Sequence, residues 1–316
     1  MIICQKFPLN NQLDWKELIE KSQTASFFQS KEWLTIWLNH FPVKSFILAV
    51  YDDSDLVGLA PFSIIKKTIN ILGVAPVLGK ELVSDYGDII GVAGREKEIW
   101  QSIVNYLKNH YPRFDLVLDF LREDSESFNI LRPLAKKISE TDVAPYLDLK
   151  KNWEDYLGGL ERKYRHELRR KIRRLEEIDS LFYQGDINRD KNEFLRLMRL
   201  SSPTKDKFLS EKMGKFFSDL MSNLDKKIVG LWFLEIDKKK TAGLLTFRFK
   251  DKILLYNSGF DPAYARYSTG LLATAYLIKE SIRQGIKRFD FLRGNERYKH
   301  DLGGQNKKLY QLIIKL

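Results

Sequence analysis

The chain has 316 residues, of which 44% are apolar, so it has enough material for two domains of ordinary size or one large one. No apolar run reaches the roughly 18 residues of a membrane span, and the first residues lack the apolar stretch of a signal peptide. A single cysteine, Cys4, excludes an internal disulfide framework and a cysteine-based zinc site. We therefore expect a cytoplasmic protein without a structural metal.

The formal net charge is +11. A basic balance of this size favours anionic partners such as nucleotides, phosphates, RNA or a membrane face. A lysine-rich solvated surface gives the same balance, so the charge alone does not choose among these classes.

Strands and one helix are predicted in the N-terminal half from apolar runs and periodicity. Strand-like runs occupy residues 45–51, 56–65 and 68–72, a helix with one apolar face covers 95–109, and a further strand covers 114–120.

A strongly basic helix is predicted over residues 153–178 from apolar residues that recur every three or four positions. Four arginines form a stripe roughly opposite this apolar face: Arg162, Arg165, Arg169 and Arg173. Two interpretations stay open. The helix either connects two domains with a solvated face, or its guanidinium groups contact phosphates.

The C-terminal half predicts a three-stranded meander followed by a helix and two strands. The strands of the meander cover residues 227–236, 242–249 and 253–259; the helix covers 268–284 and ends at Gly285; the last strands cover 288–292 and 308–315.

The order of meander, helix and strand therefore occurs twice. The sequence FDFLRG at residues 289–294 also resembles DFLRE at residues 119–123. We expect an α/β (α+β) fold with two related halves: residues 1–150, a basic connecting helix at 151–180, and residues 181–316.

The start of the helix after the meander is a candidate phosphate site. It reads Arg266, Tyr267, Ser268, Thr269 and Gly270. Unsatisfied backbone N–H groups and the positive end of the helix dipole converge at such a start and suit a phosphate. Arg266 can add a forked contact. The alternative is that Ser268 or Thr269 simply caps the helix.

The chain has no Walker A motif, no G-x-S-x-G elbow and no H-E-x-x-H motif. What remains is chemistry in which the protein positions two substrates and supplies a modest acid or base. Acyl transfer to an amine fits, because an activated ester needs orientation and oxyanion stabilisation more than a protein nucleophile.

The sequences GFDPAYARYSTG at residues 259–270 and FDFLRGNERYK at residues 289–299 resemble the C-terminal half of GNAT-fold acyltransferases of the CelD-like and Fem-like type. The resemblance extends to residues 27–41, 56–62 and 83–90, so it covers most of the chain. It implies two tandem GNAT-like domains, each with a mixed, mainly antiparallel sheet, and an N-acyl or aminoacyl transfer activity.

The resemblance also implies a donor and an acceptor side. Residues 181–316 hold the acyl donor, with acyl-CoA phosphates at Arg266 to Gly270, and residues 1–150 hold the acceptor. The helix start has one glycine where GNAT phosphate loops have more. The donor therefore stays open between coenzyme A, an acyl carrier protein and aminoacyl-tRNA.

Catalytic residues are implied at Arg293, Glu296 and Tyr298, with Lys299 as a substrate contact. A carboxylate can accept the proton of an attacking ammonium, and a tyrosine can protonate the departing group. Arg293 can neutralise a substrate phosphate or carboxylate. The alternatives are a charged surface loop and, for Arg293, an ion pair with Asp290 or Glu296.

Acceptor contacts are implied at Ser84, Asp85 and Tyr86, within the loop at residues 78–88, and Arg165 of the arginine stripe is a further candidate substrate contact. Ordinary turn chemistry is the alternative for the loop. The acceptor is open among amines of cell-envelope precursors, polysaccharides and amino acids. From a different class, the chain could be a non-catalytic RNA- or polyanion-binding protein of the same fold.

Overall fold

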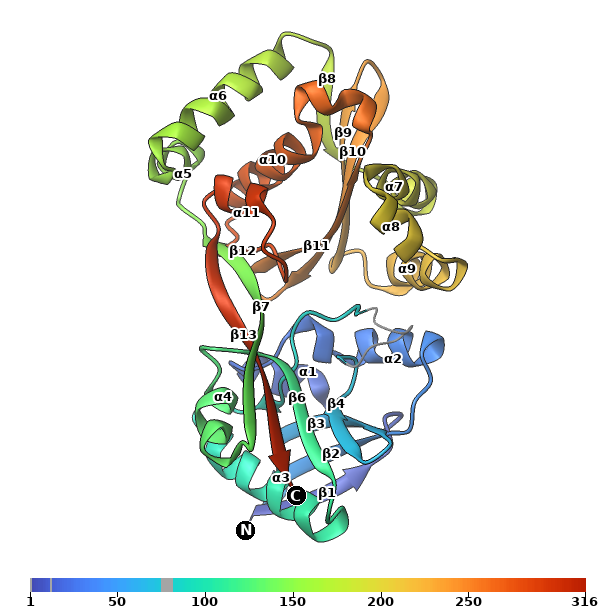
Figure 1. Ribbon diagram of the computed structural model, residues 1–316, viewed down its shortest axis with the longest axis vertical. Helices are drawn as coiled ribbons and strands as arrows, with labels where there is room; N and C mark the ends of the chain where they lie inside the picture. The colour runs from blue at the N-terminus through green and yellow to red at the C-terminus, as the bar shows by residue number, and fades with distance from the viewer. Residues whose placement is uncertain (1, 12, 75–81) are drawn as a thin grey trace. The chain divides into compact units, whose positions relative to one another are not determined.

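The ribbon of the computed structural model is shown in Figure 1. It describes residues 2–11, 13–74 and 82–316. Within these residues, no helix is both long enough and apolar enough to cross a membrane.

The chain divides into two compact units, one formed by residues 1–143 with 307–316 and the other by residues 144–306. The expected assignment of residues 181–316 to one domain differs from this division at its end. The reason is that the last strand, β13 (Gln305–Lys315), pairs antiparallel with β6 (Asp115–Arg122) of the first unit.

The first unit is built on a mixed, mainly antiparallel sheet in the order β1-β2-β3-β4-β6-β13-β7, with β5 paired to β3. Helix α3 packs on strands β1 to β3. The other bounds are β1 (Ile2–Phe7), α1 (Trp15–Lys21), η1 (Phe27–Gln29), α2 (Lys31–His40), β2 (Ser45–Asp52), β3 (Asp55–Ile65), β4 (Thr68–Ile71), β5 (Ile90–Gly91), α3 (Glu96–His110), α4 (Glu126–Leu131), η2 (Arg132–Leu134) and β7 (Lys137–Asp148).

The second unit has the strand order β7-β12-β11-β10-β9-β8. Helix α10 lies on one side of the β9–β11 meander and α7 on the other (Figure 1), and both pack against it. The bounds are α5 (Trp153–Gly159), α6 (Arg162–Glu176), β8 (Ser180–Gln184), α7 (Ile187–Ser201), α8 (Pro203–Phe208), α9 (Glu211–Asn223), β9 (Val229–Ile236), β10 (Lys239–Phe249), β11 (Lys252–Phe260), η3 (Pro262–Tyr267), α10 (Thr269–Arg283), β12 (Arg288–Asp290) and α11 (Arg297–Asp301).

The repeated order predicted from the sequence is present in the structure. In the first unit, β2, β3 and β4 are followed by α3 and then β6, which pairs parallel with β4. In the second unit, β9, β10 and β11 are followed by α10 and then β12, which pairs parallel with β11. The predicted α/β fold with mainly antiparallel sheets is confirmed.

The single basic helix predicted over residues 153–178 is wrong in one respect, because it breaks into α5 and α6. The break follows from Gly158 and Gly159, which weaken a helix interior, and from the extended backbone of Leu160. Leu168 and Leu175 of α6 are buried in the core of the second unit, as their periodicity predicts.

Asp88 is a buried carboxylate of the first unit, and both of its side-chain oxygens accept hydrogen bonds. Its side chain is 3% exposed. It accepts hydrogen bonds from the hydroxyls of Ser125 and Ser127, both at 2.5 Å, and from the Ile89 N–H at 2.7 Å. Burial, opposed by these bonds, raises the pKa of Asp88 to about 6.

We expect Asp88→Ala to lower the free energy of unfolding by about 2 kcal/mol or more, because three buried donors lose their acceptor. Chemical denaturation measures this, with the exposed Glu126→Ala as a control that changes stability by less than about 0.5 kcal/mol. The folded pKa lies above that of the unfolded chain. Stability of the native protein therefore falls as the pH rises between about 4 and 6, and Asp88→Ala should lack this slope.

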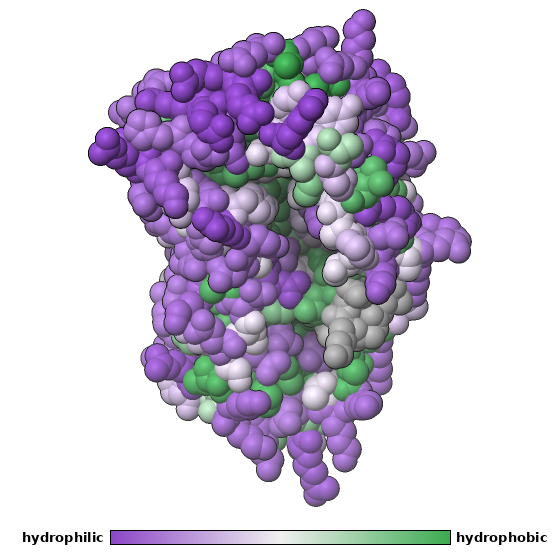
Figure 2. Space-filling view, turned by 45° about the horizontal axis from the view of Figure 1, so that its top comes forward, coloured by the Kyte–Doolittle hydropathy of each residue, from purple (hydrophilic) through white to green (hydrophobic). Residues whose placement is uncertain are grey.

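The face shown in Figure 2 is covered mainly by hydrophilic side chains, with apolar residues scattered among them. This agrees with the high content of charged residues, 30% of the chain.

Candidate active site

The C-terminal end of β11 in the second unit extends beyond its pairing with β12. β11 and β12 pair in parallel only from Lys252–Arg288 to Leu254–Asp290, whereas β11 continues to Phe260. On the other side, Leu245 pairs with Asn257 and Thr246 with Leu255, so Tyr256 forms a bulge. A bulge bends a strand and turns its backbone groups in a new direction.

Side chains take the place of a neighbouring strand at Ser258. The Ser258 N–H donates to Oδ1 of Asn257 at 3.0 Å, and the Ser258 carbonyl accepts from Nζ of Lys205 on α8. Both backbone groups of Ser258 therefore point to the open side of β11. The Ser258 N–H can exchange its hydrogen bond to the Asn257 side chain for one to a substrate carbonyl oxygen.

Lys205 is the residue of this region that the sequence analysis missed. Burial of its ammonium lowers the pKa of Lys205 to about 8; the charge of Glu296 opposes this shift and that of Lys299 adds to it. The sequence around it, SSPTKDK, is typical of an exposed turn. Its position follows only from the folded structure, in which Nζ of Lys205 reaches the Ser258 carbonyl of β11, so no local sequence signal could have found it.

Lys299 holds the loop that follows β12. It is 3% exposed and donates to the carbonyls of Leu292, Arg293 and Gly294 at 3.2, 2.9 and 3.0 Å. Its Nζ also lies 2.9 Å from a carboxylate oxygen of Glu296. An ammonium has three donors, so these acceptors use all of them. Lys299, expected to contact substrate, organises the loop instead of presenting free donors.

The loop requires glycine at position 294. Its φ is +112°, and a Cβ there would meet a carboxylate oxygen of Glu296 at 2.6 Å. Glu296 thereby lies close against the backbone, with its side chain 59% exposed. Arg293 and Glu296 lie in the loop between β12 and α11, and Lys299 on α11 is bonded to both of them.

Tyr298 follows in the same segment. Its ring packs edge-on against Phe291 with centroids 6.3 Å apart. Burial, and secondarily the charge of Glu296, raises the pKa of Tyr298 well above its usual value. The phenol therefore keeps its proton at neutral pH and suits a proton donor better than a proton acceptor.

The start of α10 carries no side-chain cap. Ser268 adopts a left-handed conformation with φ of 55° and makes no capping hydrogen bond, so the simple N-cap alternative does not describe it. Thr269 is 1% exposed, and its hydroxyl has no hydrogen-bond partner in the described part of the chain. No side chain caps the first N–H groups of the helix, so they can donate to a ligand. An anion is the ligand that such a helix start binds best.

The start of α10 adjoins the end of β11. A Cβ on Gly270 would lie 3.2 Å from the ring of Phe260, the last residue of β11. Arg266 is exposed, with its guanidinium 4.7 Å from the centroid of the Tyr267 ring. The helix start and the open strand end therefore form one region of the second unit.

A cation already lies at this helix start. Nζ of Lys171 on α6 donates to the Ser268 hydroxyl at 2.9 Å. An ammonium next to the positive end of a helix dipole is unfavourable unless an anion joins them. Glu167, 3.6 Å from Lys171, offsets part of this charge but is also bound by Arg170.

The remaining predicted contacts have structural partners. Arg165 donates to the Gly158 carbonyl at 2.9 Å, and Arg169 pairs with Glu154 at 3.0 Å, so both fasten α6 to α5. These two bonds support the structural interpretation for that part of the arginine stripe.

Ser84, Asp85 and Tyr86 are buried in the first unit. The Ser84 hydroxyl accepts from the Trp33 indole at 3.1 Å, and Tyr86 packs edge-on against Phe28. The part of this loop at residues 78–81 lies outside the described residues.

Comparisons with known proteins agree with this architecture. Residues 162–300 match the family model described as acetyltransferase (GNAT) domain. No curated protein is significantly similar to the chain.

Three solved structures share the fold over nearly the whole chain. FemX has a TM-score of 0.69 at 11% identity, covering 98% of each chain. The C-terminal domain (DUF2156) of a putative lysylphosphatidylglycerol synthetase from Agrobacterium fabrum has a TM-score of 0.58 at 9% identity, covering 95% of this chain and 92% of that one. A tandem GNAT protein from the clavulanic acid biosynthesis pathway has a TM-score of 0.51 at 9% identity, covering 98% of each chain.

Proposed function

We propose that this protein, whose residues 162–300 form a GNAT acetyltransferase domain, transfers an acyl or aminoacyl group from an activated donor such as acyl-CoA to an amine. The observation that carries the proposal is the open end of β11 beside the uncapped start of α10. A strand backbone that is held only by exchangeable side-chain hydrogen bonds can bind a carbonyl, and an uncapped helix start can bind a phosphate, so one donor molecule can occupy both.

Donor phosphates would be held by the N–H groups at Thr269 and Gly270, with Lys171 as the countercharge. Arg266 is exposed beside this start and can add a forked contact. Coenzyme A carries its phosphates at the far end of the pantetheine arm from the thioester, and aminoacyl-tRNA carries phosphates beside its 3′-terminal adenosine. FemX and the lysylphosphatidylglycerol synthetase domain share only the fold with this chain, so they leave the choice of donor open.

The reaction is a direct attack of the amine on the donor carbonyl. A C–N bond forms, and the resulting oxyanion accepts a hydrogen bond from the Ser258 N–H. The C–S or C–O bond to the leaving group then breaks. Tyr298, which keeps its proton, gives it to the leaving group. No protein nucleophile takes part, so the protein acts by orientation and by stabilising charge.

Two groups beside the strand end can take the proton that the acceptor ammonium must lose before its nitrogen attacks. Glu296 was expected from the sequence, but its carboxylate is engaged by Lys299. Burial lowers the pKa of Lys205 to about 8, so a substantial fraction of its amine is neutral near that pH. The neutral amine has a lone pair to accept the proton, and one of its N–H groups can still donate to the Ser258 carbonyl. We assign the role of proton acceptor to Lys205. Glu296 is assigned the role of adjusting the pKa of Lys205 through its charge.

The acceptor contacts at Ser84, Asp85 and Tyr86 stay a prediction. Amines of cell-envelope or polysaccharide precursors and of amino acids remain the acceptor classes to test. An alanine scan of these three residues against acceptor KM, at fixed donor concentration, would identify any contact.

The proposed donor site is tested by Gly270→Val, which places a branched side chain against Phe260 at the helix start. We expect the KM for the donor to rise about tenfold or more, with the acceptor KM unchanged. Gly158→Ala is the matched control, because a Cβ there meets nothing within 4 Å. Equal donor KM values for Gly270→Val and the native protein would refute the assignment.

The second candidate function is RNA or polyanion binding without catalysis, which the basic face of α6 favours. Arg173 and Arg174 are exposed there and make no ion pair with any described residue. Such binding weakens steeply with salt. If separate substitutions of Arg293, Glu296 and Tyr298 leave every measured activity unchanged while RNA binding persists, this second function is the correct one.

A further inference from the structure

A pocket of about 390 Å³ in the second unit lies where β9 begins and β10 ends. The two strands contribute alternate residues to its lining: Gly230, Trp232, Thr246 and Arg248. Residues two apart in a strand share a face of the sheet, and Gly230 pairs with Thr246 across the two strands. All four therefore lie on one face. Cavities of several hundred Å³ are typical of small-molecule sites.

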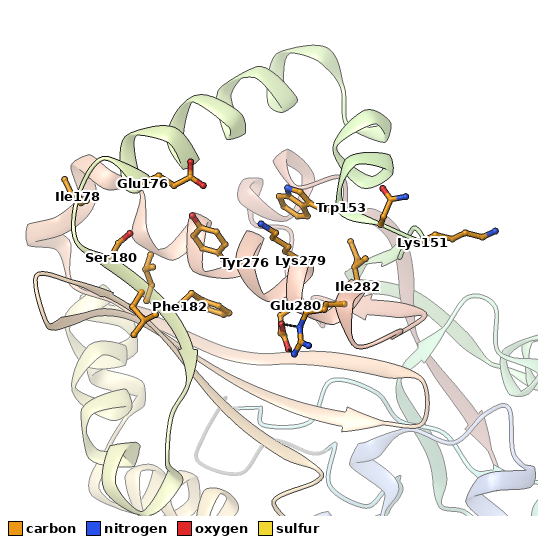
Figure 3. Close-up of a pocket in the computed structure, with 14 residues that line it drawn as sticks. Lys151, Trp153, Glu176, Ile178, Ser180, Phe182, Tyr276, Lys279, Glu280 and Ile282 are labelled. Atoms are coloured by element: carbon orange, nitrogen blue, oxygen red, sulfur yellow. Dashed lines mark hydrogen bonds and ion pairs between the residues drawn. The ribbon is translucent and has the colours of Figure 1, made fainter.

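The pocket lies at the opposite end of α10 from the proposed donor site. Trp232 packs in the same core as α10, and Gln284, the residue at which that helix ends, lines the pocket. The helix has 15 residues, which corresponds to a length of about 22 Å. The pocket also shares no described lining residue with the cleft between α6 and α10 that Figure 3 shows. Its occupant is therefore a second ligand and not a part of the donor.

Three cations converge on this pocket, and no acid lines it in the described part of the chain. Lys226 and Lys227 lie in the turn before β9, and Arg248 lies near the end of β10. All three are exposed, and none of them forms an ion pair with a residue that the structure describes. The turn is fixed in place, because Oδ1 of Asp225 accepts from the Lys227 N–H at 2.8 Å and the Ile228 carbonyl accepts from the Arg248 N–H at 2.7 Å.

The C-terminal end of α10 attracts cations as the negative pole of the helix dipole, but it does not occupy their donors. Its last carbonyls already have backbone partners. The Gly285 N–H donates to the Ile282 carbonyl, and the Ile286 N–H donates to the Ser281 carbonyl, both at 3.0 Å. The ammonium and guanidinium groups of the pocket are therefore available to a ligand.

The pocket also has a buried indole N–H without an acceptor. Trp232 is 8% exposed, and its Nε1 has no hydrogen-bond partner among the described residues. Phe182, which lies next to Tyr276 in Figure 3, stacks on Trp232 with ring centroids 5.7 Å apart and fixes the indole. A Cβ on Gly230 would lie 2.8 Å from this Nε1 and 2.6 Å from the Thr246 hydroxyl oxygen. Glycine thus leaves room beside both polar atoms, and an acceptor placed there removes the cost of the unpaired N–H.

We propose that this pocket binds a phosphate group, with its oxygens held by Lys226, Lys227 and Arg248 and one of them accepting from the Trp232 indole. Ammonium and guanidinium groups are strong phosphate ligands, and an indole N–H can only donate, so the lining selects an acceptor with negative charge. The two sources of this chemistry are free phosphate and the phosphomonoester of a small metabolite. The site is independent of the proposed transfer activity.

Titration of inorganic phosphate into the full chain, followed through the indole ¹⁵N–¹H resonances, tests the proposal. We expect the Trp232 signal, assigned by its loss in Trp232→Phe, to move saturably. The signal of Trp100 is the internal control and should stay fixed, because its Nε1 already donates to a serine hydroxyl at 2.7 Å. Coenzyme A in excess should leave the phosphate-induced shift in place.

Lys227→Ala and Arg248→Ala should each weaken phosphate binding about tenfold. Both residues are exposed, so folding should be unaffected. Lys239→Ala is the matched control, because it removes the same charge from an exposed position of β10 outside this lining. Its affinity for phosphate should equal that of the native protein.

The source of the phosphate group follows from a second titration with glucose 6-phosphate. Tighter binding of this ester than of inorganic phosphate indicates a phosphorylated metabolite, and weaker binding indicates free phosphate. A Trp232 signal that neither compound moves, or equal weakening by Lys239→Ala, overturns the proposal. A shift that coenzyme A abolishes, or that only an RNA oligonucleotide produces, assigns the response to the donor site or to RNA binding and also overturns it.

Discussion

Lys205→Met is expected to lower kcat about 100-fold or more at pH 8, with little change in donor affinity. The physical reason is that Lys205 is proposed to take the proton of the acceptor amine, and a positioned proton acceptor typically contributes about 10² to 10⁴ in rate. Methionine has similar length and keeps the packing of α8, so the loss should come from the missing amine.

The pH dependence gives this prediction its sharpest readout. With a folded pKa of about 8, Lys205 is protonated at lower pH and cannot accept a proton. The native rate should therefore rise with pH up to about 8 and then level. Glu296 raises this pKa, so Glu296→Gln should move the rise to lower pH while keeping substantial activity. If Glu296→Gln is inactive and Lys205→Met retains the native rate, Glu296 is the proton acceptor instead.

Stability offers an independent check on Lys205. Its folded pKa lies below the unfolded value of 10.5, so the unfolded chain binds more protons between about pH 8 and 10. The free energy of unfolding of the native protein should gain from this group as the pH rises through that window. Lys205→Met should lack this contribution.

Lys299→Met is expected to lower the free energy of unfolding by about 3 kcal/mol or more, and to reduce transfer at least 100-fold. It leaves the carbonyls of Leu292, Arg293 and Gly294 without their donor, and each buried unsatisfied group costs about 1 to 3 kcal/mol. The loop that carries Glu296, and the start of α11 that carries Tyr298, should then lose their fixed positions.

Thermal and chemical denaturation, together with the transfer assay, measure these effects. Lys163→Met, at an exposed position of α6, is the control and should be nearly neutral. Lys299→Arg keeps the charge and the donors, so it should recover part of the stability. Native-like stability and rate in Lys299→Met would show that the loop is held by other contacts.

Local patterns predicted the repeated meander, helix and strand of each half, but not the helices α7, α8 and α9. Apolar periodicity identified the helix that became α10, and the alternating runs before it became β9 to β11. The motif at residues 289–299 brought Arg293, Glu296, Tyr298 and Lys299 together because they lie in one short segment. Residues that are close in sequence are close in space, so a cluster within one segment can be predicted from the sequence alone.

The rest depends on tertiary packing that no local pattern carries. The predicted helix over residues 153–178 broke because two glycines interrupt a periodicity that continues across them. Lys205 reached β11 through the placement of α8, and its lowered pKa comes from burial that the sequence SSPTKDK does not indicate. Likewise, only the structure shows that all the donors of Lys299 are used by backbone carbonyls and Glu296.

The most direct test of the central claim is a mass-spectrometric time course of acyl transfer. The purified protein would be mixed in turn with acyl-CoA, acyl-loaded carrier protein and aminoacyl-tRNA, each with a mixture of amine acceptors. We predict that an acylated amine appears with one of these donors, that Lys205→Met slows it at least 100-fold, and that the protein itself is never acylated. An acylated protein that forms and decays as product appears, or no product from any of the three donors, would contradict transfer by direct attack.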